Sequence, residues 1–328
     1  MSWENYKSMP KRQPLSYRIK KGIFVGAMIF TALWLVFTAI SRSFPLQISE
    51  FATRYSLWRA GVVAARSGVL EVYTHDGCAV KSAQGADCVC VALIHGLGDN
   101  AMTWKKILVA PTEGFTLPAK VVAVDLPGSG ESPAPAQAGD YSVRKQAEWV
   151  HQALAPICPK WVVVGNSLGG WVASWLALEW KGGVSRLILA DAVGAKQTTA
   201  DAVKLMTEPT VESMKEFLSK IYYQSQELPD FVWVALVKKM KSSNVSQVVV
   251  AQTPADFLGD RLNELHVPTL ILWGAADRLT PKEMSLDYQA GIKGSILREV
   301  PKCGHAPQRE CPLAIIAAIN DMMNFGAF

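Results

Sequence analysis

Ser167 has glycines at both second neighbours, Gly165 and Gly169. It follows an apolar run, Trp161–Val164, and precedes a segment with a helical pattern, Trp171–Trp180. Glycines at these places let a strand and a helix approach closely, so a serine in the turn between them stands exposed above a sheet. This pattern is typical of a nucleophile elbow, and it predicts that Ser167 is a covalent nucleophile. A turn whose serine only caps the following helix is the alternative.

A serine nucleophile needs a base that removes its proton and an acid that orients the base. Asp277 follows the apolar run Pro268–Trp273, and His305 follows the run Ile296–Val300. Open α/β sheets place functional groups just beyond the carboxyl ends of their strands. The chain order serine, aspartate, histidine is the order expected for an elbow of this kind. We therefore predict a catalytic triad of Ser167, Asp277 and His305.

Other acids and bases fit this pattern less well. Asp191 also follows a predicted strand and is the rival acid, but Asp277 has the better flanking pattern. The remaining histidines are interpreted as surface, capping or structural residues: His75, His95, His151 and His266.

Two backbone N–H groups are expected to form an oxyanion hole, because the charge that develops on the attacked oxygen must meet preorganised donors. Leu168 directly follows the nucleophile, and its N–H is the first predicted donor. The second is expected in the loop His95–Gly98, where the N–H of Leu97 is the candidate. The leucine side chains carry no information about this role.

The body of the chain is electrically neutral. The 328 residues are half hydrophobic and carry a net charge of +5. Residues 1–21 hold six of the 33 basic residues and one of the 28 acidic ones, so the remainder carries 27 of each. Nucleic-acid binding needs a concentrated basic face, so no nucleic-acid partner is expected. The length suits one large α/β domain with an insertion, and the sequence does not indicate an oligomeric state.

Residues 22–40 contain no charged side chain. As a helix they would extend about 28 Å, close to the roughly 30 Å of a bilayer core. The basic cluster precedes this run, so the positive-inside rule predicts a cytoplasmic leader over residues 1–21 and a catalytic domain on the outer side of the membrane. We predict a single-pass transmembrane signal anchor over 22–40 and a linker over 41–68. Export after signal cleavage near Ser41 is the alternative.

Six cysteines are present, and in an exported domain an even count permits disulfides. Cys303 and Cys311 bracket a short loop, and Cys78 and Cys88 bracket a predicted hairpin connection, so either pair could close. Reduced cysteines in the core are the alternative, and the sequence leaves the choice open. The cysteine spacing does not match a zinc site.

From Val69 onward the chain alternates β-rich runs with amphipathic helical stretches, which predicts a doubly wound, mostly parallel α/β sheet. Continuous apolar runs suit parallel strands that are covered on both faces. The predicted strands are Gly68–His75, Cys88–Ile94, Lys120–Asp125, Trp161–Gly165, Arg186–Ala190, Pro268–Trp273 and Ile296–Val300.

The interval between Ala192 and Val267 shows no strand pattern. It is polar, helix-prone and contains clusters of aromatic residues. We predict a helical cap over residues 195–265, inserted into a core formed by residues 69–194 and 266–328. The cap is expected to cover the carboxyl edge of the sheet, with most of its aromatic side chains in its own small core.

With these pieces in place, the chain resembles the α/β-hydrolase family. The matching motifs are His95–Gly98, Asp125–Ser132, the elbow at Ser167, Asp277 and Gly304–His305. The resemblance extends from Val69 to the C-terminus and implies that Asp125–Ser132 is a structural loop. Epoxide hydrolases and haloalkane dehalogenases of this family carry aspartate at the elbow, so Ser167 argues against both.

The resemblance implies a serine hydrolase that acts on a small apolar ester without a metal or an organic cofactor, like carboxylesterases and lipases. Two other activities are implied as well: carbon–carbon bond hydrolysis of the meta-cleavage-product type, and acyl transfer. A non-enzymatic, membrane-tethered binding protein on a hydrolase fold is a third alternative, which the intact triad argues against. The segment Glu208–Leu218 is similar to the cap of meta-cleavage-product hydrolases. Those enzymes usually carry a Gly-Pro-Gly-type oxyanion loop and a tryptophan after the histidine, whereas this chain has Gly96–Gly98 and Ala306–Pro307 there.

Overall fold

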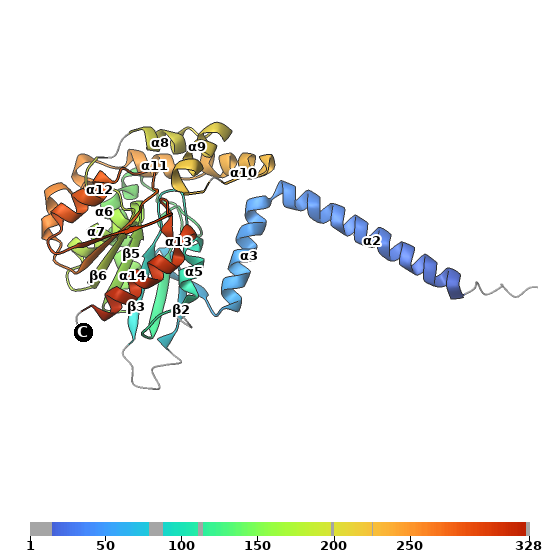
Figure 1. The fold of residues 1–328 in the computed structure, drawn as a ribbon, viewed down its shortest axis with the longest axis horizontal. Helices are drawn as coiled ribbons and strands as arrows, with labels where there is room; N and C mark the ends of the chain where they lie inside the picture. Colours follow the sequence, from blue (N-terminus) through green and yellow to red (C-terminus); the bar gives the residue numbers. More distant parts are fainter. Residues whose placement is uncertain (1–14, 79–87, 111–113, 198–199, 225, 326–328) are drawn as a thin grey trace, which may run out of the picture. The chain divides into compact units, whose positions relative to one another are not determined.

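The computed structural model describes residues 15–78, 88–110, 114–197, 200–224 and 226–325 (Figure 1). Side chains 15–26, 29, 32 and 200–202 are outside the description, although their backbone lies in helices. The chain forms two compact units, Met1–Ile48 and Ser49–Phe328.

Helix α2, Leu15–Ser43, contains the uncharged run. Among the residues whose placement is described, no helix combines the length and the apolarity that crossing a bilayer requires. The predicted anchor over 22–40 falls in part on side chains outside that description. The predicted leader over 1–21 lies largely outside the described residues as well.

The segment 41–68, expected to be a linker, contains ordered elements. Helix α3 spans Pro45–Arg59, and strand β1 spans Val63–Ser67. Near the end of α3, Leu57 is buried in one face of the sheet domain. β1 pairs antiparallel with β2, Leu70–Asp76. Burial of Leu57 and pairing of β1 therefore make residues 49–68 part of the Ser49–Phe328 unit.

Eight strands form one sheet in the order β1-β2-β4-β3-β5-β6-β7-β8. β1 and β2 are antiparallel to their neighbours, and the pairs from β4 to β8 are parallel. The further strands are β3 Val89–Ile94, β4 Ala119–Val124, β5 Trp161–Asn166, β6 Val184–Ala190, β7 Thr269–Gly274 and β8 Ile296–Val300.

Helices cover both faces of the sheet, as the continuous apolar strands predicted. Alternate residues of β3 belong to different cores: Ala92 and Ile94 pack in one, and Val91 and Leu93 in the other. The first core is closed by α6 Val143–Leu154, α7 Leu168–Glu179 and α12 Glu283–Gly291. The second is closed by η2 Ala101–Trp104, α5 Lys105–Leu108 and α14 Pro312–Asn324. The predicted doubly wound, mostly parallel sheet is confirmed.

Between β6 and β7 the chain is helical. The elements are α8 Ala200–Thr207, α9 Val211–Ile221, α10 Asp230–Lys241, α11 Val245–Val250, η5 Pro254–Asp256 and η6 Gly259–Glu264. Helices α8 to α11 lie together beyond one end of the strands (Figure 1). They have a small apolar core of their own, in which Met206, Met214, Phe217, Trp233 and Val245 are buried. This group of helices is called the cap below.

All six cysteines are paired, as Cys78–Cys88, Cys90–Cys158 and Cys303–Cys311. The alternative of reduced cysteines in the core is therefore wrong. The Cys90–Cys158 pair was not foreseen. Its partners are 68 residues apart, and both lie in the core closed by α6 and α7.

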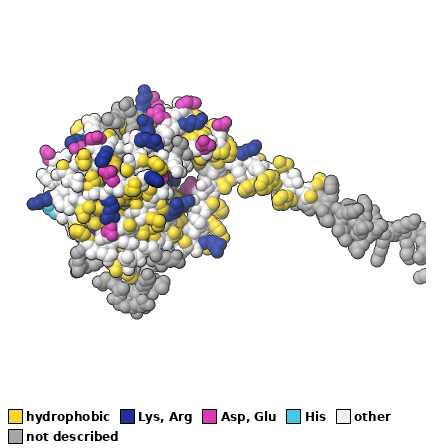
Figure 2. All heavy atoms as spheres, in the orientation of Figure 1, with side chains coloured by type: hydrophobic (Ala, Val, Ile, Leu, Met, Phe, Trp, Pro, Cys, Tyr) yellow, Lys and Arg dark blue, Asp and Glu magenta, His cyan; other side chains and the backbone are white. Residues whose placement is uncertain are grey.

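The visible face of the Ser49–Phe328 unit carries basic and acidic side chains in scattered positions (Figure 2). Neither sign of charge gathers into one field on that face. This distribution agrees with the neutral charge balance of the sequence body.

Candidate active site

The strand-to-helix turn at Ser167 is sharp and strained. Ser167 has φ 54° and ψ −120°, a conformation that non-glycine residues rarely adopt. A Cβ atom on Gly165 would lie 2.2 Å from the carbonyl oxygen of Gly169, and one on Gly169 would lie 2.2 Å from that of Ile94. Only glycine permits these approaches. The glycine pattern therefore does what an elbow requires: it presses α7 against β3 and β5 and holds the serine at the turn.

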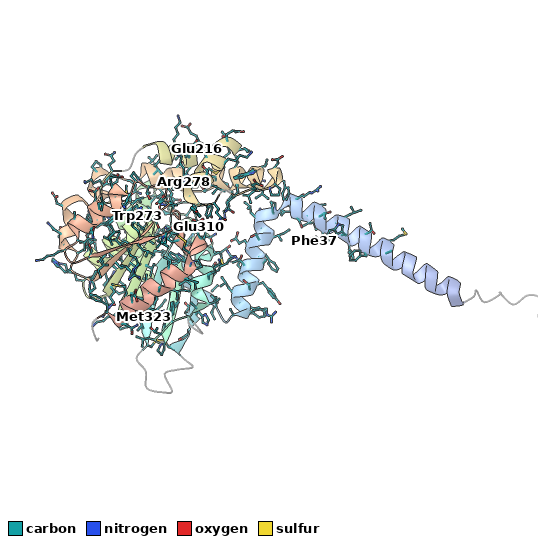
Figure 3. The ribbon with its side chains drawn as sticks, viewed as in Figure 1. Phe37, Glu216, Trp273, Arg278, Glu310 and Met323 are labelled. Carbon is teal, nitrogen blue, oxygen red and sulfur yellow. A yellow bond between two sulfur atoms is a disulfide. The ribbon has the colours of Figure 1, made fainter. Side chains whose placement is uncertain are left out.

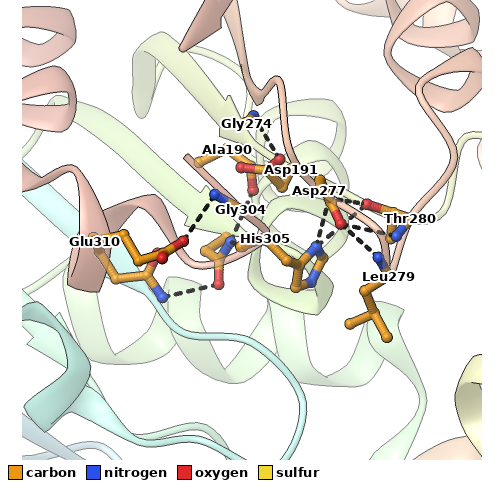
Figure 4. Close-up of polar contacts among 11 residues, drawn as sticks. Ala190, Asp191, Gly274, Asp277, Leu279, Thr280, Gly304, His305 and Glu310 are labelled. Carbon is orange, nitrogen blue, oxygen red and sulfur yellow. Dashed lines mark hydrogen bonds and ion pairs between the residues drawn. The ribbon is translucent and has the colours of Figure 1, made fainter. Parts of the chain in front are cut away.

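Asp277 and His305 meet beyond the ends of β7 and β8 (Figure 4). The imidazole Nδ1 of His305 lies 2.8 Å from a carboxylate oxygen of Asp277, and both side chains are buried. The same oxygen accepts a hydrogen bond from the hydroxyl of Thr280. The other oxygen accepts from the backbone N–H groups of Leu279 and Thr280, at 2.8 and 3.0 Å. The carboxylate is therefore fixed by its own loop while it orients the imidazole.

Asp277 is ionised at neutral pH. Burial acts to raise its pKa, but the adjacent His305 and the hydrogen bonds from Thr280 outweigh burial, so the pKa lies below its ordinary value. An ionised carboxylate on Nδ1 keeps the other ring nitrogen available as a base.

Asn166 ties the elbow to the histidine loop. Its side-chain amide donates to the backbone carbonyl of His305 at 2.9 Å and to that of Ala190 at 3.1 Å. Its side-chain oxygen accepts from Gln308 at 3.0 Å. The hydroxyl of Ser167 makes no hydrogen bond to any residue that the structure describes. The serine is thus held next to the histidine loop with its hydroxyl uncommitted.

The two segments that carry the predicted oxyanion donors lie beside Ser167. Leu168 is the first residue of α7, and neither its N–H nor that of Leu97 donates to another described group. The backbone at Gly96 passes so close that a Cβ there would lie 3.2 Å from the Cβ of Ser167. The His95 side chain connects this loop to the segment after β4: its Nδ1 lies 2.8 Å from the carbonyl of Gly96, and its Nε2 accepts from the N–H of Leu126 at 3.0 Å.

The Asp125–Ser132 segment folds on itself. The two carboxylate oxygens of Asp125 accept from the N–H groups of Ala101 and Glu131 at 2.7 and 2.9 Å. The hydroxyl of Ser132 donates to the carbonyl of Asp125 at 2.6 Å. These bonds give the segment the structural role that the resemblance implied.

Asp191, the rival acid, lies close to Asp277 and His305, but the carboxylate that meets the imidazole Nδ1 is that of Asp277. It is fully buried at the end of β6, has φ 46°, and accepts a hydrogen bond from the N–H of Gly274 at 2.8 Å. Its other oxygen has no hydrogen-bond partner among the described residues. One oxygen of each carboxyl and a ring nitrogen of His305 lie within 4.8 Å of one another. Burial, and then the Asp277 carboxylate, hold the pKa of Asp191 well above its usual range.

The raised pKa of Asp191 predicts a pH effect on the free energy of unfolding. The unfolded chain loses this proton near pH 4, whereas the folded chain keeps it to higher pH. Stability therefore falls as pH rises above 4 until the folded group titrates, by at most about 1.4 kcal/mol per pH unit. Asp191→Asn should remove this slope in denaturant unfolding measured between pH 4 and 7, whereas the exposed control Asp260→Asn should keep it. Equal slopes in both variants would show that Asp191 ionises normally in the fold.

The cap places an apolar surface against the catalytic loops. A Cβ on Gly98 would lie 3.1 Å from the methyl carbon of Met206 and 3.3 Å from a methyl carbon of Val245. Leu97, from the oxyanion loop, and Leu279, from the aspartate loop, pack against the same cap core. The rim of the site and the cap therefore form one hydrophobic cluster.

Sequence reasoning missed Thr280 and Glu310. The spacing Asp-x-x-Thr, in which an aspartate accepts from backbone three residues on, could have identified Thr280. No local signal identifies Glu310, whose carboxylate accepts from the N–H groups of Gly304 and Tyr223. Away from the site, the ring of His75 contacts the carbonyl of Leu108, and the ring of His151 lies 4.4 Å from that of Trp180 in a tilted arrangement. Neither histidine approaches the catalytic loops.

Sequence comparisons give the same picture. A family model described as the alpha/beta hydrolase family matches residues 91–319. A 2-hydroxy-6-oxononadienedioate/2-hydroxy-6-oxononatrienedioate hydrolase of Klebsiella pneumoniae is 30% identical over 238 residues, which cover 67% of this chain and 82% of the relative. Hydrolase 1 of the same name from Pseudomonas putida is also 30% identical, over 241 residues with the same coverage.

Solved structures share the fold. A membrane phospholipase A, described as a bacterial virulence factor, superposes with a TM-score of 0.71 at 23% identity, covering 93% of this chain and 98% of that one. A meta-cleavage product hydrolase from Pseudomonas fluorescens IP01 superposes with a TM-score of 0.65 at 21% identity, covering 81% and 98%. The match of the family model, the doubly wound sheet and the strained elbow lead to one conclusion: the chain belongs to the α/β-hydrolase family and is a hydrolase.

Proposed function

We propose that the protein cleaves carboxylic esters of apolar acyl groups through an acyl-enzyme. One observation carries this proposal: the side chains of Leu97, whose N–H is a predicted oxyanion donor, and of Leu279, two residues after Asp277, pack against the apolar core of the cap. An acyl chain on Ser167 would extend under this cluster. The nearby Arg309 is already paired with Asp99 at 2.7 Å, so it is not a free partner for an anionic substrate.

The proposed mechanism assigns one role to each predicted site residue. Ser167 attacks the ester carbonyl, and His305 takes its proton. Asp277 holds the imidazole and stabilises its charged form. The N–H groups of Leu97 and Leu168 receive the oxyanion, and the imidazolium then protonates the leaving alcohol. Water, activated by the same imidazole, releases the acid. No step calls on a metal or an organic cofactor.

Carbon–carbon bond hydrolysis is the second candidate, and the curated relatives favour it. Their names describe hydrolases of a dienedioate, and they are 30% identical over most of their length. A meta-cleavage product hydrolase is also among the structural neighbours. Such a substrate carries two carboxylates, which need cationic or N–H partners. The apolar rim of this chain suits an uncharged acyl chain better.

A substrate panel separates the two candidates. We expect kcat/KM for p-nitrophenyl esters to rise with acyl length, by up to about fourfold per methylene, because each buried CH₂ contributes about 0.8 kcal/mol. A ring-fission dienoate should react more slowly than the best ester. A higher kcat/KM for the dienoate would replace ester hydrolysis by carbon–carbon hydrolysis. Product ratios that change with added alcohol would point to acyl transfer.

We also propose that residues 22–40 anchor the protein in a membrane, with the catalytic domain on the outer side. The uncharged run, the basic residues before it and three disulfides support this location, because disulfides persist in oxidising compartments. The full chain should stay with membranes after alkaline carbonate extraction. The double variant Leu33→Arg, Leu35→Arg should be released, since charge within the span opposes insertion. Release of the unaltered chain would contradict the anchor.

A further inference from the structure

The end of cap helix α9 is bonded to both catalytic loops. A helix leaves its last carbonyl groups without partners inside the helix. Here the carbonyl of Ile221 accepts from the backbone N–H of His305 at 2.7 Å. The carbonyl of Lys220 accepts from the N–H of Arg278 at 3.2 Å, and that of Tyr222 from the Arg278 guanidinium at 2.6 Å. The residues that cap α9 are therefore His305 itself and the neighbour of Asp277.

Glu310 bridges the same two parts of the molecule. One carboxylate oxygen accepts from the N–H of Gly304, directly before His305, at 2.8 Å. The other accepts from the N–H of Tyr223, just beyond α9, at 2.9 Å. Arg278 and Glu310 both lie between the cap helices and the sheet (Figure 3). Glu310 forms no ion pair with any described side chain. Its carboxylate binds the backbone N–H groups of Gly304 and Tyr223 instead.

The backbone around His305 is built for this contact. A Cβ on Gly304 would lie 2.1 Å from the carbonyl oxygen of Ile221 and 2.8 Å from a carboxylate oxygen of Glu310. Glycine at 304 thus admits both the cap carbonyl and the carboxylate. Glu310 ends the short helix α13, Pro307–Glu310, and the next residue closes the Cys303–Cys311 disulfide. His305 therefore lies in the loop closed by the Cys303–Cys311 disulfide, and Glu310, in the same loop, binds the N–H of Gly304.

We infer that Glu310 is a positioning residue that couples docking of the cap to placement of the catalytic base. This inference rests on the proposed role of His305 in serine hydrolysis. When the cap is docked, Tyr223 completes the Glu310 bridge and Ile221 fixes the N–H of His305. When the cap moves away, the histidine loop loses both contacts. The imidazole is thus held in its working position only while the cap covers the site.

The test is the rate at which a fluorophosphonate labels Ser167 in the full-length protein. This rate depends on activation of the serine and not on the natural substrate. Glu310→Gln keeps the side-chain shape but turns one acceptor into an NH₂ group that faces an N–H donor. We expect labelling and kcat for a short ester to fall about tenfold, with KM changed less than twofold, because displacement of a catalytic group acts on the reacting geometry. The exposed Glu283→Gln is the matched control and should match the unaltered protein.

Hydrogen exchange gives an independent readout. In Glu310→Gln, the amides of Tyr223 and His305 should both lose protection, and the ester rate should recover partly in Glu310→Asp, which keeps a carboxylate. Labelling within twofold of the unaltered protein, or unchanged exchange at His305, would overturn the coupling. Absence of labelling in the unaltered protein would instead defeat the serine mechanism, so the two failures are distinguishable.

Discussion

Ser167→Ala should lower kcat for ester hydrolysis by roughly 10⁴- to 10⁶-fold, with little change in KM, because the hydroxyl forms the covalent bond and binds the ground state weakly. The elbow should persist in this variant. Alanine carries the same Cβ as serine, so the cost of φ 54° is unchanged and the unfolding midpoint should stay near that of the unaltered protein. Steady-state kinetics and thermal unfolding measure the two quantities.

Ser174→Ala is the matched control. Ser174 lies in the same helix, is fully buried, and donates to the carbonyl of Gly170 at 2.9 Å. Its loss removes one buried hydrogen bond, worth about 1 kcal/mol of stability, and should leave kcat within about threefold. Comparable activity in the Ser167 variant and the unaltered protein would remove Ser167 from the reaction.

Asp277→Asn should lower kcat by about 10⁴-fold, because the amide no longer holds the imidazole in the tautomer that accepts the serine proton. The effect should be this large because Asp277 meets the imidazole Nδ1 directly at 2.8 Å. A fall in kcat without a matching fall in thermal stability is the expected signature.

Asp191→Asn provides the contrast, because Asp191 is the alternative candidate for the acid that orients His305. Burial favours the neutral form of Asp191 by raising its pKa, and asparagine, which carries no charge, can still accept from the N–H of Gly274. We expect its kcat to stay within about threefold of the unaltered protein. The opposite ranking of the two variants would assign the orienting acid to the end of β6 instead of β7.

The candidate site could be predicted from the sequence because its signals are local. Glycines around Ser167 act within five residues, and the apolar runs before Asp277 and His305 identify the strands they follow. Parallel strands then bring their carboxyl ends to one edge. The structure places all three residues in the loops and turn at that edge.

Elements that depend on distant partners could not be predicted in this way. Four of the five residues of β1 are exposed, so this edge strand lacks the alternating pattern that marks a half-buried strand. In α3 only Leu57 is buried, so the helix lacks the repeated apolar positions that would have indicated a buried face. The hydrogen bond between Glu310 and Tyr223 joins residues that are 87 positions apart, and no local sequence pattern near either residue predicts it.

The Cys303–Cys311 disulfide makes the covalent closure of the His305 loop depend on the redox state of the chain's surroundings. A newly made chain in a reducing cytoplasm holds two thiols there, and the loop that carries His305 has no covalent clasp. Oxidation of these two thiols closes the loop around His305. The covalent order of this loop therefore depends on the redox conditions under which the chain folds.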